Sequence, residues 1–261
     1  MQAFTCVEKL VRKGASKKSE DQTGNQDEVM QDAFAGPPTP EEVETMWDEA
    51  ARQGELIVAA RASDGGKSAT KAARRAHQAA VTGTADHTIL CHLLSGILLA
   101  YKHPSLMDAM LELHPAPHPY ANLDQLQINV AAYHQLLAIL PPGLLDHCKP
   151  SILRAVPSRD LPNSFGIRSL DDAGSEMFGY GVWPEASYWN HNCEPNIQKK
   201  RVGRAWEFWT CKDVKSGEEL CITYLGGDEK VLDVAERRKR LQTTWGFTCA
   251  CSKCDREARF L

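Results

Sequence analysis

Three cysteines are crowded near the C-terminal end of the chain, at positions 249, 251 and 254. Cys251 and Cys254 have the C-x-x-C spacing that lets two thiolates bind one tetrahedral ion, and Cys249 can add a third. Structural zinc sites normally have four protein ligands, so a fourth is expected from elsewhere in the chain. The spacing therefore predicts a zinc site. The alternative is a metal-free, partly exposed cysteine tail.

Four short segments in the last third of the chain carry most of the residues of chemical interest. They are residues 190–196 (Asn-His-Asn-Cys-Glu-Pro-Asn), residues 217–224 (Gly-Glu-Glu-Leu-Cys-Ile-Thr-Tyr), residues 245–247 (Trp-Gly-Phe) and the cysteine cluster. Each segment is weak alone, but their order and spacing closely resemble the motifs of SET-domain protein lysine methyltransferases. Residues 163–167 and 181–187 resemble segments of the branch whose SET domain is split by a MYND zinc finger, with fungal relatives most similar.

The resemblance supplies the missing zinc ligand. In the SET family the cysteine of the Asn-His-x-Cys motif closes the post-SET zinc site, and that cysteine is Cys193 here. The expected ligands of a structural Zn²⁺ are therefore Cys193, Cys249, Cys251 and Cys254. The ion would tie the C-terminal tail to the loop formed by residues 190–196.

The resemblance also implies that the chain binds S-adenosylmethionine. Asn190 and His191 would hold the adenine and the methionine part of this cofactor through side-chain and backbone groups. Phe247 would stack near the adenine, and Ser187 and Asn163 are further candidates for the same pocket. Without the surrounding motifs, Asn190 and His191 would be interpreted as a turn at a capped helix end.

The implied reaction moves a methyl group from a sulfonium to the neutral amine of a lysine. Such a displacement needs alignment and a deprotonated nucleophile more than a strong acid or base. Tyr224 is the expected catalytic residue, because its hydroxyl can orient the amine. Phe165 is the candidate wall of the substrate channel, where its ring would attract the incoming lysine and desolvation would lower the pKa of that lysine. Core packing is the alternative role for Phe165, and the substrate is expected to be a lysine-containing protein, histone or non-histone.

Two parts of the resembled family are not visible in the sequence. A MYND finger needs a series of cysteine and histidine pairs, but the only cysteine before residue 91 is Cys6. The family also uses an N-terminal glycine motif to cradle the cofactor, and residues 1–60 contain no Gly-x-Gly. Two interpretations follow: a methyltransferase whose front strands come from residues 1–60, or a catalytically weak SET relative that serves as a zinc-containing interaction module.

A third interpretation is a zinc-containing nucleic-acid binder. It would use two basic clusters, formed by Lys199, Lys200, Arg201 and Arg204 and by the run Arg237, Arg238, Lys239 and Arg240. Direct nucleic-acid binding is nevertheless not expected, because acidic neighbours offset both clusters and a charge run on a helix is usually a solvated face.

The order of the predicted elements indicates an α+β fold of SET type, with helices first and short strands later. Residues 1–38 are predicted to be a disordered or divergent N-terminal segment, and residues 39–150 a mainly helical region that resembles a SET insert. Residues 151–242 are assigned to the C-terminal SET core. Residues 243–261 are assigned to the post-SET zinc segment.

Capping signals and apolar spacing predict the individual elements. Thr39, followed by Pro40 and Glu42, predicts a helix start, Asp86 can cap a second helix, and residues 123–140 have helical spacing. Residues 196–202 and 205–211 are predicted to form a hairpin, and residues 220–224 a short strand. Residues 229–242 are predicted to form a charged helix whose inner face carries Val231, Val234 and Leu241.

Composition and charge indicate in which cellular compartment the chain is expected to work. The chain has 261 residues with 43% apolar residues and a formal net charge of -4, which gives no global basic field. The longest apolar stretch, residues 89–101, is shorter than the roughly 20 residues that a membrane span needs. Residues 1–10 lack the order of a signal peptide. Clustered cysteines therefore favour a reducing intracellular compartment, the nucleus or the cytoplasm.

Overall fold

The computed structural model describes residues 36–63, 68–169, 176–226 and 230–259. The chain divides into two compact units, which are described separately: Met1–Asp108 with His118–Ser158, and Ala109–Pro117 with Arg159–Leu261. Of the segment predicted to be disordered, residues 1–35 lie outside the described residues.

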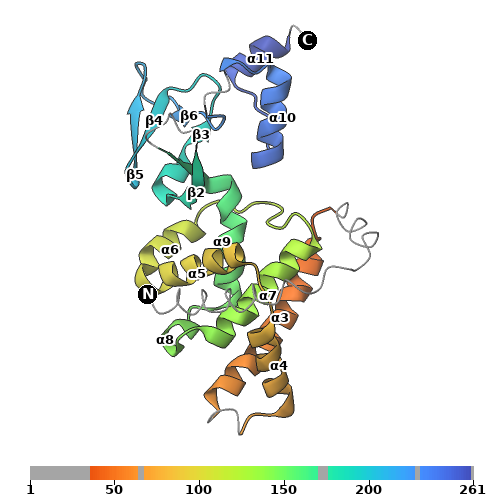
Figure 1. Ribbon diagram of the computed structural model, residues 1–261. Helices are drawn as coiled ribbons and strands as arrows, with labels where there is room; N and C mark the ends of the chain where they lie inside the picture. The colour runs from red at the N-terminus through yellow and green to blue at the C-terminus, as the bar shows by residue number, and fades with distance from the viewer. Residues whose placement is uncertain (1–35, 64–67, 170–175, 227–229, 260–261) are drawn as a thin grey trace. The chain divides into compact units, whose positions relative to one another are not determined.

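The first unit consists of helices (Figure 1). They are α3 (Pro40–Ala62), α4 (Lys71–Thr82), α5 (His87–Lys102), α7 (Leu123–Ile139) and α8 (Pro142–Leu145), while α6 (Pro104–Leu111) and α9 (Pro150–Asn163) contribute residues to both units. The predicted helix starts are confirmed. The Thr39 hydroxyl accepts from the Glu42 amide at 3.2 Å, the Glu42 carboxylate accepts from the Thr39 amide at 2.7 Å, and Asp86 caps α5.

A continuous apolar core holds these helices together, because each presents one apolar stripe to its neighbours. Trp47 of α3 is buried, and its indole N–H donates to the Tyr120 hydroxyl at 3.2 Å, which satisfies the polar end of a large apolar ring. The other fully buried large side chains of this core are Ile57, Leu90, Leu93, Leu94, Ile97, Leu126, Leu136, Leu140 and Leu153.

The described residues of the second unit form three two-stranded sheets, and helices follow them near the end of the chain. β1 (Ser164–Arg168) pairs antiparallel with β2 (Met177–Val182), β3 (Asn190–His191) pairs parallel with β6 (Cys221–Ile222), and β4 (Ile197–Val202) pairs antiparallel with β5 (Ala205–Thr210). A 3-10 helix, η2 (Pro184–Tyr188), lies between β2 and β3 in the sequence. The helices α10 (Val234–Trp245) and α11 (Ser252–Ala258) follow and lie side by side (Figure 1).

The α+β fold class is confirmed, and so is the hairpin, whose two-residue connection places Gly203 at a φ of 60°. The charged helix predicted near the end of the chain is wrong in two details, its first residue and the position of Val231, and residue 229 lies outside the described residues. The helix predicted over 229–242 begins at Val234, because the Asp233 carboxylate caps it by accepting from the Glu236 amide. Val231 precedes that cap and is 84% exposed rather than on an inner face. The residues after Pro150 continue as helix α9 to Asn163 before the first strand begins.

The close packing of α5 against α9 gives a stability prediction. A Cβ at buried Gly96 would overlap the branched Val156 side chain, which has little rotamer freedom to move away. We expect Gly96→Ala to lower the free energy of unfolding by up to about 2 kcal/mol, because overpacking costs about 1–3 kcal/mol and the gain in helix propensity offsets only about 1 kcal/mol. Urea denaturation measures this change in the free energy of unfolding. Gly143→Ala is the control, since a Cβ there meets nothing within 4 Å, and equal midpoints for the two variants would contradict the packing.

Candidate functional site

The loop formed by residues 190–196 is fastened to the segment formed by residues 217–224. β3 of this loop pairs with β6 of that segment. In addition, the side chain of Asn196 binds one backbone N–H and one backbone carbonyl of the segment. Its Oδ1 accepts from the Cys221 amide at 2.8 Å, and its Nδ2 donates to the Glu219 carbonyl at 2.8 Å. Asn196 is only 4% exposed, so these bonds replace those it would make to water. The two motifs therefore form one structural piece.

Four cysteine sulfurs meet beside this piece. The Sγ atoms of Cys193, Cys249, Cys251 and Cys254 all lie within 4.8 Å of one another. The Cys193 sulfur is 3.6 Å from that of Cys254 and 3.9 Å from that of Cys249. Tetrahedral zinc with Zn–S bonds of about 2.3 Å requires sulfurs about 3.8 Å apart. The donor set and its spacing thus fit a zinc ion.

His191 connects the cysteine cluster to Tyr224. The Tyr224 backbone amide donates to His191 Nδ1 at 3.0 Å, so the imidazole proton belongs on Nε2. Nε2 lies 3.2 Å from the Cys193 sulfur and can donate to it. A hydrogen bond of this kind stabilises a thiolate and fixes its direction. The imidazole therefore links the cysteine cluster to the backbone of Tyr224.

Arg237 also contacts the cluster, at Cys254. Its guanidinium donates to the Cys254 sulfur at 3.6 Å, to the Glu257 carboxylate at 2.5 Å and to the Leu232 carbonyl at 2.6 Å. The side chain is only 1% exposed. Its neighbour Arg238 donates to the Cys249 carbonyl at 2.9 Å. The expectation that this basic run is a solvated face is therefore wrong for its first two residues, which support the cysteine cluster.

Cys193, Cys249 and Cys251 differ in pKa because their surroundings differ. Burial raises the pKa of Cys193, and the neighbouring Cys254 and Cys249 raise it further. Burial also raises the pKa of Cys249, to about 11. Burial opposes ionisation of Cys251 as well, but hydrogen bonds from the Cys254 and Cys193 backbone lower its pKa to about 7. Cys251 is therefore the first of these three thiols to become a thiolate.

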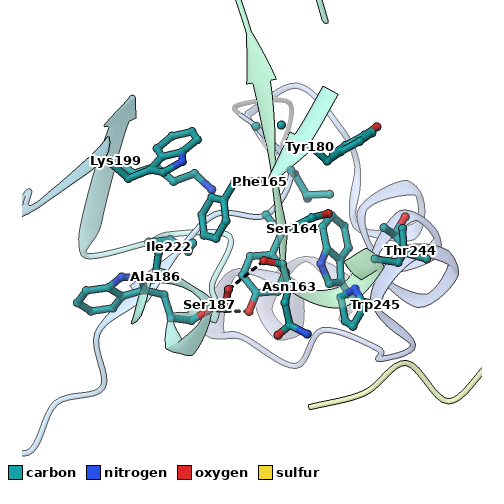
Figure 2. Close-up of a pocket in the computed structure, with 18 of the residues that line it drawn as sticks. Asn163, Ser164, Phe165, Tyr180, Ala186, Ser187, Lys199, Ile222, Thr244 and Trp245 are labelled. Atoms are coloured by element: carbon teal, nitrogen blue, oxygen red, sulfur yellow. Dashed lines mark hydrogen bonds between the residues drawn. The ribbon is translucent and has the colours of Figure 1, made fainter. Parts of the chain in front are cut away.

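A cavity of about 590 Å³ opens within the second unit (Figure 2). Of the residues predicted from the sequence to work on substrate or cofactor, Asn163, Phe165, Ser187 and Tyr224 line it. Figure 2 shows Ser187 beside Asn163, where the Ser187 hydroxyl donates to the Asn163 carbonyl at 2.9 Å. Residues from β1, η2 and the segment after β6, far apart in the sequence, thus face one space.

Tyr224 is held by contacts on three sides. Its hydroxyl donates to the Trp189 carbonyl at 2.7 Å, its amide is fixed by His191, and its ring lies 5.1 Å from that of Trp245. Burial raises the pKa of the phenol above its ordinary value, and charge on Cys221 and Glu219 adds to this. The hydroxyl is therefore neutral at physiological pH, with a lone pair that can accept one further hydrogen bond.

Three predicted cofactor residues lie outside the described lining of this cavity. Asn190 is exposed, and its amide donates to the Glu219 carboxylate at 2.7 Å. The His191 ring lies next to that of Tyr224, with ring centroids 5.3 Å apart. The Phe247 ring packs near both, at 6.1 Å from His191 and 6.4 Å from Tyr224. The structure thus places these side chains beside the cavity wall.

An aromatic corner, defined as Phe165, Trp183 and Trp206, forms another part of the site. The Phe165 ring is 5.2 Å from that of Trp206 and 6.2 Å from that of Trp183. Lys199 of β4 reaches this corner, with its Nζ 5.1 Å from the centroid of the Phe165 ring. Sequence reasoning grouped Lys199 with a basic surface cluster. The alternation of β4, which leaves Lys200 exposed and Lys199 half-buried, was the available signal.

Within the described ranges, no helix has both the length and the apolar character needed to cross a membrane.

Residues 49–225, more than half of the chain, match the model of the SET domain family. The match covers the helical region from α3 onwards as well as the strands, and it ends directly after Tyr224.

Curated relatives agree with this match. The chain is 39% identical over 129 residues to the potential protein lysine methyltransferase SET6 of Saccharomyces cerevisiae, covering 48% of this chain and 34% of that protein. It is 28% identical over 199 residues to the histone-lysine N-methyltransferase ASHR2 of Arabidopsis thaliana, covering 69% of this chain and 49% of that protein. It is 33% identical over 113 residues to mouse histone-lysine N-methyltransferase SMYD3, covering 40% of this chain and 26% of that protein. The chain thus spans half or less of the length of these relatives.

The acidity order of the thiols predicts a reactivity order in metal-free protein. At pH 7.5 we expect iodoacetamide to modify Cys251 at least tenfold faster than Cys193 or Cys249, because the thiolate is the reacting form. Peptide mass spectrometry after short exposures measures the three rates. Protein unfolded in urea is the control, where the three rates should converge. Modification of Cys193 first in the folded protein would contradict the arrangement.

Proposed function

Since the chain belongs to the SET domain family, we propose that it is an S-adenosylmethionine-dependent protein lysine N-methyltransferase. One observation carries this proposal: a single cavity of about 590 Å³ is lined by Tyr224, Phe165, Asn163 and Ser187, four residues that the family resemblance selects. The volume lies within the roughly 300–1,000 Å³ that small-molecule sites typically have. Relatives named as lysine methyltransferases support the same activity.

We assign the cofactor to the side of the cavity that carries Asn163 and Ser187. The Ser187 hydroxyl and the Asn163 backbone already bond to each other, which fixes the polar groups of this side. Both nitrogens of the His191 ring face protein atoms, so we assign the cofactor contacts of His191 to its backbone. Asn190 and Phe247 complete the proposed set. S-adenosylmethionine, when bound, would supply a methyl group on a positively charged sulfur.

Tyr224 is proposed to orient the substrate amine. Its hydroxyl proton is committed to the Trp189 carbonyl, so the phenolic oxygen can accept an N–H from the amine and direct the amine lone pair along the cavity. Burial raises the pKa of Tyr224, so the phenol stays protonated and cannot remove a proton from the amine. Alignment and desolvation by the aromatic walls, with Phe165 among them, therefore provide the rate enhancement.

Zinc bound by Cys193, Cys249, Cys251 and Cys254 is proposed to be structural. Four thiolates close a tetrahedral site and leave no open position for water or substrate. Such a site carries a net charge of about -2, which the Arg237 guanidinium and the His191 N–H offset. The substrate is expected to be a lysine-containing protein, histone or non-histone, encountered in the nucleus or the cytoplasm.

A catalytically weak SET relative that works as a zinc-containing interaction module is the second candidate. The observation that favours it is the absence of a Gly-x-Gly motif from residues 1–60, where the resembled family has a cofactor cradle.

The first test is calorimetric titration of the purified chain with S-adenosylmethionine, followed by a methyl-transfer assay on histones and on a mixed protein extract. We expect binding, and we expect Tyr224→Phe to lower kcat at least tenfold while leaving cofactor affinity unchanged, because only alignment of the amine is lost. Tyr188→Phe is the matched control, since Tyr188 is exposed and lies outside the described lining. No binding at millimolar cofactor would favour the interaction module and overturn the enzyme proposal for this chain.

The second test concerns zinc. Cys193→Ser is expected to lower the zinc content measured by atomic absorption, because it removes one of four ligands, while Cys211→Ser, at an exposed cysteine outside the cluster, leaves it unchanged.

Arg237→Met should retain zinc in isolation but lose it at least tenfold faster to a chelator, since the thiolates lose a buried cationic donor. Lys239→Met, on the exposed part of the same run, is its control. Equal chelation rates for the two variants would show that Arg237 does not act on the metal.

A further inference from the structure

We propose that Lys199 occupies the cation position of the aromatic corner and thereby selects the uncharged form of a lysine side chain that enters the cavity. The inference rests on the proposed function of this cavity and adds to it a specificity-determining residue. Lys199 lines the same cavity as Tyr224, although the two residues come from different segments.

Contacts with Phe165 and with the Thr223 backbone place the Lys199 ammonium at the aromatic corner. Its Nζ lies 5.1 Å from the centroid of the Phe165 ring and donates to the Thr223 carbonyl at 3.0 Å. Figure 2 shows the side chain reaching toward the ring of Phe165. Thr223 directly precedes Tyr224, so the internal ammonium lies next to the residue proposed to orient the substrate amine. The chain therefore already places a lysine at the ring where an incoming lysine would be attracted.

The backbone of the hairpin explains why Lys199 and not its neighbour is at this position. Successive side chains of a strand point to opposite faces, and β4 pairs Lys199 with Phe208 and Lys200 with Glu207. Lys200 is accordingly exposed, whereas Lys199 is half-buried against the aromatic corner. The two lysines are adjacent in sequence and equal in charge, but only Lys199 faces the cavity.

An ammonium held on Phe165 changes what the cavity can bind. Two cations cannot share one aromatic face without repulsion, and that repulsion is strong where water is excluded. A protonated lysine must displace Lys199 from both Phe165 and Thr223, whereas a neutral amine need not. The other ionisable residues of the described lining are Arg168, Tyr180, Tyr224 and Arg240, of which Arg240 is paired with Glu236. Since only the neutral amine is a nucleophile, this selection favours the reactive form of the substrate.

The experiment measures binding of a fixed cation without turnover. The probe is N-acetyl-trimethyllysine methylamide, whose charge cannot be lost by deprotonation, and its comparison compound is the uncharged carbon isostere. Quenching of tryptophan emission reports binding, because Trp206 belongs to the aromatic corner. We expect Lys199→Met to bind the charged probe at least tenfold more tightly than the unmodified chain does, since the ring face becomes available to it. Affinity for the uncharged isostere should change less than twofold.

Three further variants make the result specific. Lys200→Met removes the same charge from the opposite face of β4 and should bind the probe as the unmodified chain does. Lys199→Arg keeps a cation at the corner and should also leave the weak binding unchanged. Lys199→Gln is a second neutral variant that should reproduce the gain seen with methionine. Unchanged or weaker binding in both neutral variants, or an equal gain in Lys200→Met, would overturn the proposal.

This measurement needs neither S-adenosylmethionine nor methyl transfer. A gain in probe affinity without detectable methyl transfer would support the role of Lys199 while overturning the enzyme proposal. Methyl transfer by the unmodified chain, without any gain in probe affinity in the neutral variants, would support the enzyme proposal and overturn the role of Lys199.

Discussion

The meeting of four cysteine sulfurs is the constraint on which the second unit depends. Cys193 and Cys254 are 61 residues apart in the sequence, yet their sulfurs lie 3.6 Å from each other. The cluster thereby fastens the C-terminal segment to the loop of residues 190–196, and Asn196 fastens that loop to β6. Ligand bonds to a metal supply free energy that a small apolar cluster cannot, so they can fix segments with few apolar contacts of their own.

The same constraint fixes one wall of the cavity. The Tyr224 amide is held by His191, which in turn faces the sulfur of Cys193, while the Tyr224 ring packs on Trp245 at the end of α10. Helix α10 is itself attached to the cluster through Arg237. Both routes from the cysteines therefore end at Tyr224. A change in the cluster is expected to displace the tyrosine before it disturbs the hairpin of β4 and β5, whose pairing is independent of it.

The sequence predicted correctly those features that depend on residues close together in the chain. The capping box at Thr39, the cap at Asp86 and the hairpin around Gly203 depend on residues within four positions of one another, and all three were predicted. The start of α10 was missed because one carboxylate, Asp233, outweighs the apolar pattern that included Val231. Strand alternation could have indicated that Lys199 faces inward, but the charge runs alone could not show which groups Lys199 and Arg237 contact. Only the packing of distant residues, Phe165 for one and Cys254 for the other, decides where each cation points.

Burial of the Arg237 guanidinium is the clearest sign that the cluster works as a charged unit. Burying a cation costs free energy unless nearby groups replace the hydration that it loses. Glu257 is the carboxylate paired with Arg237, and because it is 41% exposed, water weakens its attraction for the guanidinium. The Nε of Arg237 is buried and has no hydrogen-bond partner among the described residues, so the remaining contacts must compensate. Neutral thiols would offer only weak acceptors, whereas metal-bound thiolates would place negative charge directly beside the Arg237 guanidinium, which contacts Cys254. A charged thiolate site, as the proposed zinc would create, would account for the burial of Arg237, and the contact of Arg237 with Glu257 joins α10 to α11.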